Sequence, residues 1–135
     1  MNKPLICLTL TCPTIQEDLK LIEKYRSYID LVELRADYLS EDECLHIRQF
    51  PRLANIPCIL TIRRRIDGGQ YVGGEAARTM LFARAMAFAT QDNRNNFNYV
   101  DFEEDFHIPS LQDAALAFGT KIIRSFHDIN NPVHD

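Results

Sequence analysis

The stretch DLVELRAD, residues 30–37, has the alternation of a β-strand that packs against an apolar layer on one side only. Successive side chains of an extended chain point to opposite faces, so residues two apart share a face. One face of this stretch is apolar: Val32, Leu34 and Ala36. The other face is mostly charged: Leu31, Glu33, Arg35 and Asp37. We therefore predict a strand whose apolar face lies under helices and whose second face turns polar toward its carboxyl end.

Four further stretches are rich in β-branched and apolar residues, which is typical of strands. They are PLICLTL (4–10), IPCILTIR (56–63), NYVDFEEDF (98–106) and KIIRSFHD (121–128). Helical patterns separate the strands, with apolar residues three or four positions apart. The clearest are Ile15, Leu19 and Ile22, then Leu81, Ala85 and Phe88, then Leu111, Ala115 and Phe118. Strands that alternate with helices predict an α/β fold with a parallel sheet and right-handed crossovers.

Chain length limits which parallel fold this is. The sequence has 135 residues, which we expect to form a single domain spanning 1–135. A complete (β/α)8 TIM barrel typically needs about 250 residues. Five predicted strands therefore fit either a doubly wound sheet or an incomplete (β/α)8 barrel with about five of its eight strands.

Two segments have the sequence of a capping box, in which a hydroxyl and a carboxylate three residues apart bond free backbone N–H groups at a helix start. They are Thr14-x-x-Glu17 and Ser40-x-x-Glu43. We expect a helix to begin at each.

Composition argues against several classes of protein. The net charge of −4 is spread along the chain, so neither a nucleic-acid partner nor a membrane surface is expected. The chain has no signal-peptide pattern and no apolar stretch that approaches a membrane span. The four cysteines form no C-x-x-C pair, and Cys7 and Cys58 are expected to be reduced core residues. These features favour a cytoplasmic protein without a bound metal.

Polar side chains gather at the carboxyl ends of the predicted strands. Besides Glu33, Arg35 and Asp37, they are Thr61 and Arg63, then Asp101, Glu103 and Asp105, then Ser125 and His127. Ligand sites in parallel α/β folds lie outside these ends. A set of exposed loop residues or a structural ion-pair network is the alternative. The segment GGQYVGG (68–74) lacks the spacing of a phosphate-binding motif and predicts a loop, or a lid, after the third strand.

Taken together, four of these motifs resemble the signature strands of type I 3-dehydroquinate dehydratase. They are VELRAD (32–37), TIRRRIDGG (61–69), YVDFEED (99–105) and IIRSFHD (122–128). PLICLTL also resembles the first strand of that family. The resemblance implies a TIM barrel and an enzyme of the shikimate pathway. Such enzymes convert 3-dehydroquinate to 3-dehydroshikimate through a lysine Schiff base and need no cofactor.

The resemblance also implies roles for individual residues. Glu33, Arg35 and Arg63 would bind the substrate hydroxyls. His127 would be the general acid/base, because an imidazole can take and give protons near neutral pH. Asp101 would support His127. Asp67 would be the third catalytic residue, and it stands where the family has a glutamate, which is one methylene longer.

The Schiff-base lysine of the family would follow the histidine strand, and none of the four lysines here suits that role. Lys3, Lys20 and Lys24 precede the second strand, and Lys121 would lie about 20 Å from His127 along its strand. Two readings remain. The sequence is the first part of a longer enzyme and inactive alone, or it is a non-catalytic module that binds polyols. In either case the open edges of an incomplete barrel predict self-association.

Overall fold

The fold is a parallel sheet with helices between its strands. A computed structural model describes residues 3–86 and 93–127. The strands are β1 (Cys7–Leu10), β2 (Leu31–Arg35), β3 (Cys58–Thr61), β4 (Tyr99–Glu103) and β5 (Lys121–Ser125). They pair side by side in chain order, β1-β2-β3-β4-β5, and every pair is parallel. The predicted order of strands and helices is confirmed.

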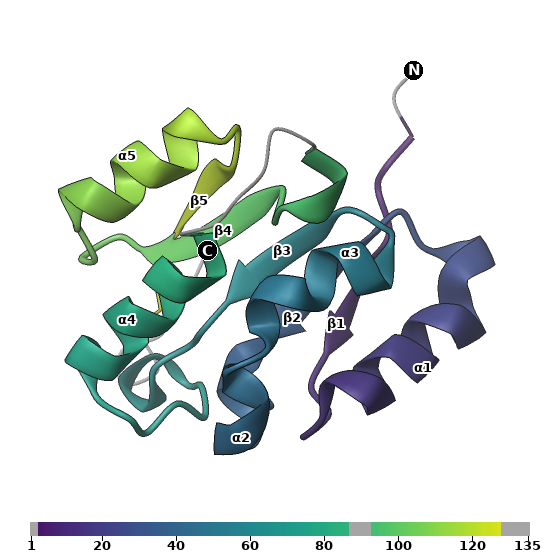
Figure 1. The fold of residues 1–135 in the computed structure, drawn as a ribbon, viewed down its shortest axis with the longest axis horizontal. Coiled ribbons are helices and arrows are strands. Elements are labelled where there is room, and N and C mark those ends of the chain that lie inside the picture. The colour runs from purple at the N-terminus through teal and green to yellow at the C-terminus, as the bar shows by residue number, and fades with distance from the viewer. Residues whose placement is uncertain (1–2, 87–92, 128–135) are drawn as a thin grey trace, which may run out of the picture.

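The main helices all lie on one face of the sheet, as Figure 1 shows. They are α1 (Ile15–Tyr25), α2 (Glu41–Cys44), α3 (Phe50–Ala54), α4 (Glu75–Met86) and α5 (Pro109–Ala117). Short 3-10 turns connect them: η1 (Arg26–Tyr28), η2 (Ala36–Tyr38), η3 (Ile47–Gln49), η4 (Arg65–Asp67) and η5 (Asn93–Asn95). Phe88, predicted to continue the helical pattern of α4, lies outside the described residues.

The hydrophobic core lies between the sheet and these helices. Val32, Leu34, Leu60 and Val100 on the strands are fully buried, as the alternation predicts. An aromatic group closes the core near α4, where the ring of Phe82 meets that of Phe102 edge-on with centroids 5.0 Å apart. Full burial of one such side chain is worth about 1.5–3 kcal/mol. The buried core residues on the helix side of the sheet therefore contribute strongly to stability.

A helix begins after each of the two predicted capping boxes, but only Thr14 makes the predicted side-chain bond to the backbone. The Thr14 side chain accepts from the Glu17 backbone N–H at 3.2 Å. Ser40 makes no side-chain cap at the start of α2. Instead, Glu43 accepts from the Ile15 backbone N–H at 2.7 Å and so caps α1 from the neighbouring β/α unit. A free N–H at a helix start can take any well-placed acceptor, and here tertiary structure supplies it.

The opposite face of the sheet carries no helix within the described residues. Apolar side chains on this face are only partly covered, among them Ile59, Tyr99 and Ile123. Cys7 also lies here and is exposed, so the prediction of a core cysteine is wrong. Leu8 and Leu10 share one face of the strand and Cys7 lies on the other, so the Cys7 side chain points away from the helices. Cys58, on the helix face, is buried as predicted.

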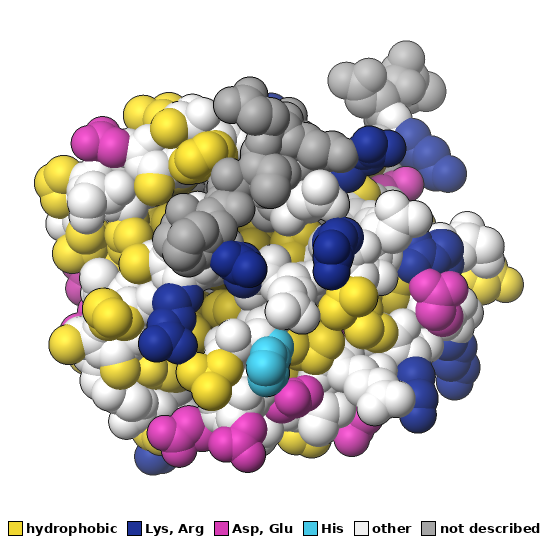
Figure 2. Space-filling view, viewed as in Figure 1, with side chains coloured by type: hydrophobic (Ala, Val, Ile, Leu, Met, Phe, Trp, Pro, Cys, Tyr) yellow, Lys and Arg dark blue, Asp and Glu magenta, His cyan; other side chains and the backbone are white. Residues whose placement is uncertain are grey.

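The helix-covered face is mixed in character. Figure 2 shows basic side chains among hydrophobic ones, with acidic side chains mainly along the lower edge of the view. Within the described residues, no helix has both the length and the apolar character needed to span a bilayer.

Candidate active site

Arg63 is the centre of a buried ion pair at the carboxyl ends of β3, β4 and β5. Its Nη1 lies 3.1 Å from Asp101 Oδ1 and 2.7 Å from Glu103 Oε2. It also donates to Ser125 Oγ at 3.1 Å, and Ser125 in turn donates to Asp101 at 2.6 Å. A buried cation is costly unless it is paired, and two carboxylates here share one guanidinium. Arg63 therefore holds three strand ends in register.

A second buried arginine reaches the same carboxylates from the helix layer. Arg78 on α4 is fully buried, and its Nη2 lies 2.8 Å from Glu103 Oε1. Its Nη1 donates to the Ile62 carbonyl at 2.8 Å, and its guanidinium lies over the Phe106 ring at 4.6 Å. Glu103 thus sits between a cation from β3 and one from α4. The ion-pair alternative raised by the sequence describes this part of the site.

Glu33 is held by hydroxyl groups. Its Oε1 accepts from Thr9 on β1 at 3.2 Å and its Oε2 from Thr61 on β3 at 2.6 Å. The side chain is half-buried on the open face, where a ligand can reach it. The Glu33 carboxylate also acts on the nearby Cys7 thiol. Although Cys7 is exposed as a residue, partial burial of its thiol and, second, the charge of Glu33 raise the pKa of Cys7.

Arg35 and Asp37 form a two-pronged ion pair at the end of β2. Arg35 Nε lies 3.0 Å from Asp37 Oδ1, and Nη2 lies 2.8 Å from Oδ2. Asp37 also accepts from the Gln70 backbone N–H at 3.0 Å. This fork fixes the orientation of Arg35. The bond from the Gln70 N–H to Asp37 also holds the loop after β3 against the end of β2.

The loop after β3, predicted as a loop or a lid, is tied down at its first half. The Tyr71 N–H donates to the Arg63 carbonyl at 3.1 Å, and the Gly69 N–H donates to the Arg64 carbonyl at 2.8 Å. A Cβ on Gly69 would lie 2.3 Å from the Arg63 carbonyl oxygen, so only glycine fits this close approach. The role of this loop as a lid stays a prediction.

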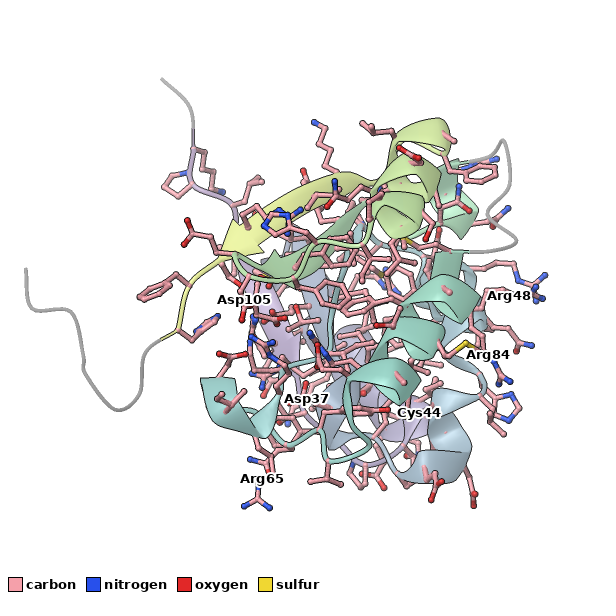
Figure 3. The ribbon with its side chains drawn as sticks, turned by 90° about the vertical axis from the view of Figure 1, so that its left-hand side faces the viewer. Asp37, Cys44, Arg48, Arg65, Arg84 and Asp105 are labelled. Atoms are coloured by element: carbon pink, nitrogen blue, oxygen red, sulfur yellow. The ribbon has the colours of Figure 1, made fainter. Side chains whose placement is uncertain are left out.

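His127 and Asp67 line one hollow at this end of the sheet. The hollow has a volume of about 320 Å³. Its lining consists of Arg64, Asp67, Glu103, Glu104, Asp105, Ser125, Phe126 and His127. Figure 3 shows Asp37, which follows β2, and Asp105, which follows β4, on the side of the molecule where the loops after the strands lie. His127 is exposed, so a ligand in the hollow can contact its ring.

The predicted site residues therefore fall into three groups. Asp67 and His127 share the hollow, whereas Arg63 and Asp101 belong to the buried ion pair beside it. Glu33 and Arg35 form the third group, on β2, which pairs with β3. Asp101 accepts its hydrogen bonds from Arg63 and Ser125, and its support of His127 stays a prediction.

Four residues of the site were not singled out from the sequence: Arg64, Arg78, Glu104 and Phe126. Arg78 stands three positions before the apolar Leu81, on the buried side of α4, and this position was a signal that could have been used. Within residues 3–86 and 93–127, no group of three His, Cys, Asp or Glu side chains is placed to hold a metal ion. The absence of a cofactor stays a prediction.

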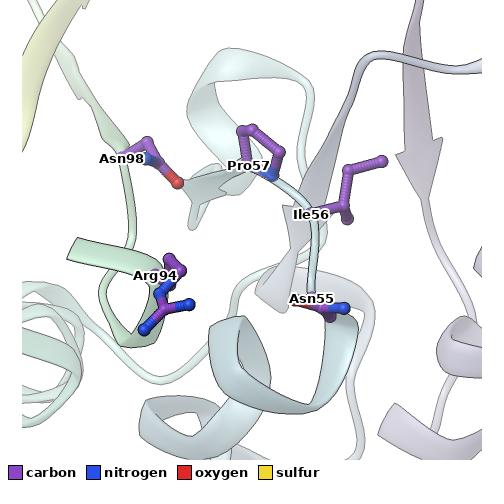
Figure 4. Close-up of a pocket in the computed structure, with 5 residues that line it drawn as sticks. All are labelled: Asn55, Ile56, Pro57, Arg94 and Asn98. Atoms are coloured by element: carbon purple, nitrogen blue, oxygen red, sulfur yellow. The ribbon is translucent and has the colours of Figure 1, made fainter. Parts of the chain in front are cut away.

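A second hollow lies at the opposite end of β3 and β4. Asn55, Ile56, Pro57, Arg94 and Asn98 line it, as Figure 4 shows, and its volume is about 200 Å³. Asn98 has a structural task there, because its Oδ1 accepts from the Cys58 N–H at 3.1 Å. Ligand sites of parallel sheets lie at the other end, so we assign the candidate site to the hollow beside His127.

Comparison with known proteins decides the family. The sequence profile described as "Type I 3-dehydroquinase" matches residues 6–135. The chain belongs to this family. The predicted resemblance to type I 3-dehydroquinate dehydratase is thereby confirmed.

Curated type I 3-dehydroquinase relatives are about twice as long as the matched segment. The chain is 31% identical over 128 residues to the 3-dehydroquinate dehydratase of Methanocaldococcus jannaschii, covering 92% of this chain and 53% of that protein. It is 29% identical to the 3-dehydroquinate dehydratase of Coxiella burnetii, covering 95% of this chain and 51% of that protein. The chain spans about half the length of these relatives and corresponds to their N-terminal half.

Solved structures agree on the fold. The type I 3-dehydroquinate dehydratase of Clostridium difficile superposes with a TM-score of 0.70 at 17% identity, over 92% of this chain and 51% of that one. The dehydroquinate dehydratase and shikimate dehydrogenase of S. pombe AroM gives 0.73 at 24% identity, over 96% and 26%. At these identities the likeness shows the fold alone. The chain therefore has the predicted fold of an incomplete TIM barrel, with five parallel strands and helices between them.

Proposed function

We propose that residues 1–135 form the proton-transfer and hydroxyl-binding part of a site that dehydrates 3-dehydroquinate to 3-dehydroshikimate. The observation that carries the proposal is the position of His127 and Asp67 on one hollow at the carboxyl ends of the strands, in a chain of the type I 3-dehydroquinase family. The reaction removes a hydroxyl group and a proton from adjacent carbons. It therefore needs a group that takes a proton and later returns one to the leaving oxygen.

Each candidate residue has a task that its surroundings permit. His127 transfers the proton, because its exposed imidazole lies at the hollow. Glu33 and Arg35 bind substrate hydroxyls from the open face, where both are partly exposed. Arg63 is only 6% exposed and engaged by two carboxylates. Because Asp101, Glu103 and Ser125 already engage its Nη1, we propose that Arg63 binds one substrate hydroxyl at most.

The same proposal places the lysine that forms the Schiff base outside these residues. Lys20 and Lys24 lie on α1, and Lys3 precedes β1. Lys121 begins β5, whereas His127 follows its end. The strand rises about 3.3 Å per residue, so Lys121 is at the wrong end of the sheet. Borohydride in the presence of 3-dehydroquinate should trap no stoichiometric adduct on this 135-residue chain, and mass spectrometry measures that directly.

The decisive experiment is a kinetic comparison of His127→Ala with the native residue, in the longest polypeptide that contains these residues. General acid–base catalysis contributes about 10²–10⁴-fold, so we expect a fall in kcat of that size. Spectrophotometry follows the conjugated product. His107→Ala is a matched control, because His107 lines a separate groove beside α4. Turnover of the His127→Ala variant at the native rate would exclude the proposed role.

We also propose that the 135-residue chain associates with a second copy. Apolar side chains are exposed near the two outer strands of the sheet, with Leu5 at 69%, Ile6 at 51% and Phe126 at 63% exposed. The outer edges of β1 and β5 have no strand partner within the described residues. Unpaired edges beside apolar side chains favour pairing between chains. Light scattering at micromolar concentration should give a mass above 15.6 kDa, and a stable monomer would contradict this.

A cytoplasmic location completes the proposal. All four cysteines are free thiols, and burial raises the pKa of Cys58 to about 12. Such thiols are typical of a reducing compartment. Fractionation with a tagged copy tests the location.

A further inference from the structure

Arg64 connects the two loops that border the hollow beside His127. Its Nε lies 2.6 Å from Asp67 Oδ2, in the loop after β3. Its Nη2 lies 2.8 Å from Asp105 Oδ1, in the loop after β4. One planar guanidinium thus holds a carboxylate on each side, and its fixed fork sets the distance between them.

Two further carboxylates stand near the same guanidinium. Glu75, at the start of α4, lies 3.7 Å from Arg64 Nη1, and Glu103 lies 3.9 Å from Nε. Among the residues that line the hollow, Arg64 is the one arginine or lysine beside four carboxylates. Burial alone would lower the pKa of Arg64, but its hydrogen bonds to Asp67 and Asp105 and the charges of Asp67 and Glu103 raise it. Arg64 therefore stays a cation at any working pH and offsets much of the negative charge around His127.

The contact with Asp67 is the one that bears on the chemistry. Asp67 is largely buried, with 9% of its side chain exposed, and η4 holds its backbone. An aspartate side chain has few rotamers, so a bond of 2.6 Å to Arg64 leaves its carboxylate one principal orientation. The Asp67 carboxylate is thus held against Arg64, and both residues line the hollow that His127 also lines.

We infer that Arg64 is a positioning residue, which acts through Asp67 to set where this short carboxylate stands relative to His127. The inference rests on the proposed function for its catalytic meaning. It gives a structural reason why aspartate can serve here: the side chain is shorter than glutamate, and the arginine fixes its place. In this inference Arg64 acts on the reaction through Asp67 and not by contact with the substrate.

A double-mutant cycle tests this inference. The variants are Arg64→Gln, Asp67→Asn and the two together, with Arg65→Gln as the matched control. Arg65 is the next residue in the chain and carries the same charge, but its side chain is exposed and points outward at the lower edge of Figure 3. The control therefore reproduces the loss of one positive charge without the loss of the clamp.

The first measurement is independent of turnover. NMR of the ¹³C-labelled His127 ring should show shifted resonances in Arg64→Gln and in Asp67→Asn, with little further change in the double variant. Arg65→Gln should leave the ring resonances in place. If Arg64→Gln changes the melting temperature but not the His127 resonances, Arg64 is merely structural and the inference is overturned. A double variant with additive shifts would also overturn it.

The second measurement is kinetic and uses the longest polypeptide that contains these residues. We expect Arg64→Gln to lower kcat by about 10²-fold with little change in KM, because small misplacements of catalytic groups cost about that much. Arg64→Lys keeps the charge without the fork, and it should recover less than a tenth of the lost rate. Full recovery by lysine would overturn a positioning role.

Asp105→Asn is a second variant, which tests the inference even if Arg64→Gln does not fold. Asp105 is mostly exposed, with 71% of its side chain accessible, so its replacement leaves the core untouched. It removes the negative charge of the outer anchor and weakens its bond to Arg64, so it should shift the His127 resonances in the same direction as Arg64→Gln, by a smaller amount. Unshifted resonances in Asp105→Asn would contradict the clamp. The proposed function fails separately, if His127→Ala retains native turnover.

Discussion

The two faces of the sheet are held by different forces. On the helix face, Leu60 and Val100 pack into a dry core with no exposed surface. On the other face, Ile59 and Tyr99 are partly exposed, and order comes from hydroxyl and ion-pair contacts such as Thr61 with Glu33. Adjacent residues of one strand, Ile59 and Leu60, thus belong to different environments. The comparison teaches that apolar packing orders the helix face, whereas polar contacts order the open face, where the proposed site residues lie.

The charged groups at the strand ends show the same difference between the open face and the helix face. The polar groups of the open face are positioned by one another, through Arg63 and Arg64, and not by a surrounding core. Such contacts are sensitive to the loss of a single partner, because the remaining charge stays buried. The predictions below follow from this difference.

The largest effect is expected from Arg63→Met, which leaves Asp101 and Glu103 without their shared cation. Breaking a buried pair in this way costs about 3–5 kcal/mol of unfolding free energy. Urea denaturation measures it. Arg52→Met, on the exposed surface of α3, serves as the control and should stay within about 0.5 kcal/mol of the native protein. If Arg63→Met lowered the unfolding free energy by less than Arg52→Met does, the ion pair would not stabilise the fold.

Leu60→Ala and Ile59→Ala compare the two faces within one strand. Leu60→Ala should cost about 2–5 kcal/mol, because it opens a cavity in the core. Ile59→Ala should cost about 1 kcal/mol, because its side chain is only partly removed from water. Chemical denaturation at low protein concentration gives both values. Equal costs would show that something covers the open face in solution, such as a second copy of the chain.

Thr14→Ala and Ser40→Ala separate the two capping motifs. Loss of the Thr14 cap should cost about 1 kcal/mol. Ser40→Ala should change stability by less than about 0.5 kcal/mol, since Ser40 has no side-chain cap to lose. Thermal melting of both variants measures the difference. If Ser40→Ala cost more stability than Thr14→Ala, this would support the capping box predicted at Ser40.

The smallest effect concerns pH. The hydrogen bond from Arg64 holds the pKa of Asp105 below its ordinary value, slightly opposed by burial. A carboxyl with a lowered pKa in the folded state stabilises the fold above its unfolded pKa of about 3.9, and this contribution is lost as pH falls through the folded pKa. Because Asp105 is mostly exposed, it is worth only a few tenths of a kcal/mol. The difference in unfolding free energy between the native chain and Asp105→Asn should shrink in acid. A constant difference would show that Asp105 does not titrate with Arg64.

Much of the fold could be predicted from the sequence, because it rests on local periodicity. The alternation in residues 30–37 placed Val32 and Leu34 in the core correctly. The strand ends were predicted too late, since Asp37 lies in the turn η2 and Arg63 follows the end of β3. Strands end where pairing with a neighbour ends, and β3 pairs with β4 at only Ile59 and Leu60. Pairing of this kind is a tertiary property that local sequence does not encode.

The candidate site could be predicted in its residue types and its location but not in its partners. Alternation placed Asp101 and Glu103 on the polar face, where they lie. Which arginine each carboxylate meets depends on the register between strands far apart in the sequence. Glu103 bonds Arg63 and also meets Arg78 from α4, and nothing in the strand pattern indicates the second contact.

The order of the strands has a consequence for synthesis. Because β1 to β5 pair in the order in which they occur in the chain, each strand after the first finds its neighbour already made when it leaves the ribosome. Synthesis proceeds at about 5–20 residues per second, far more slowly than helices form. Each helix can therefore settle on two finished strands before the next unit emerges. Chain elongation itself can lead the sheet through its assembly, one β/α unit at a time.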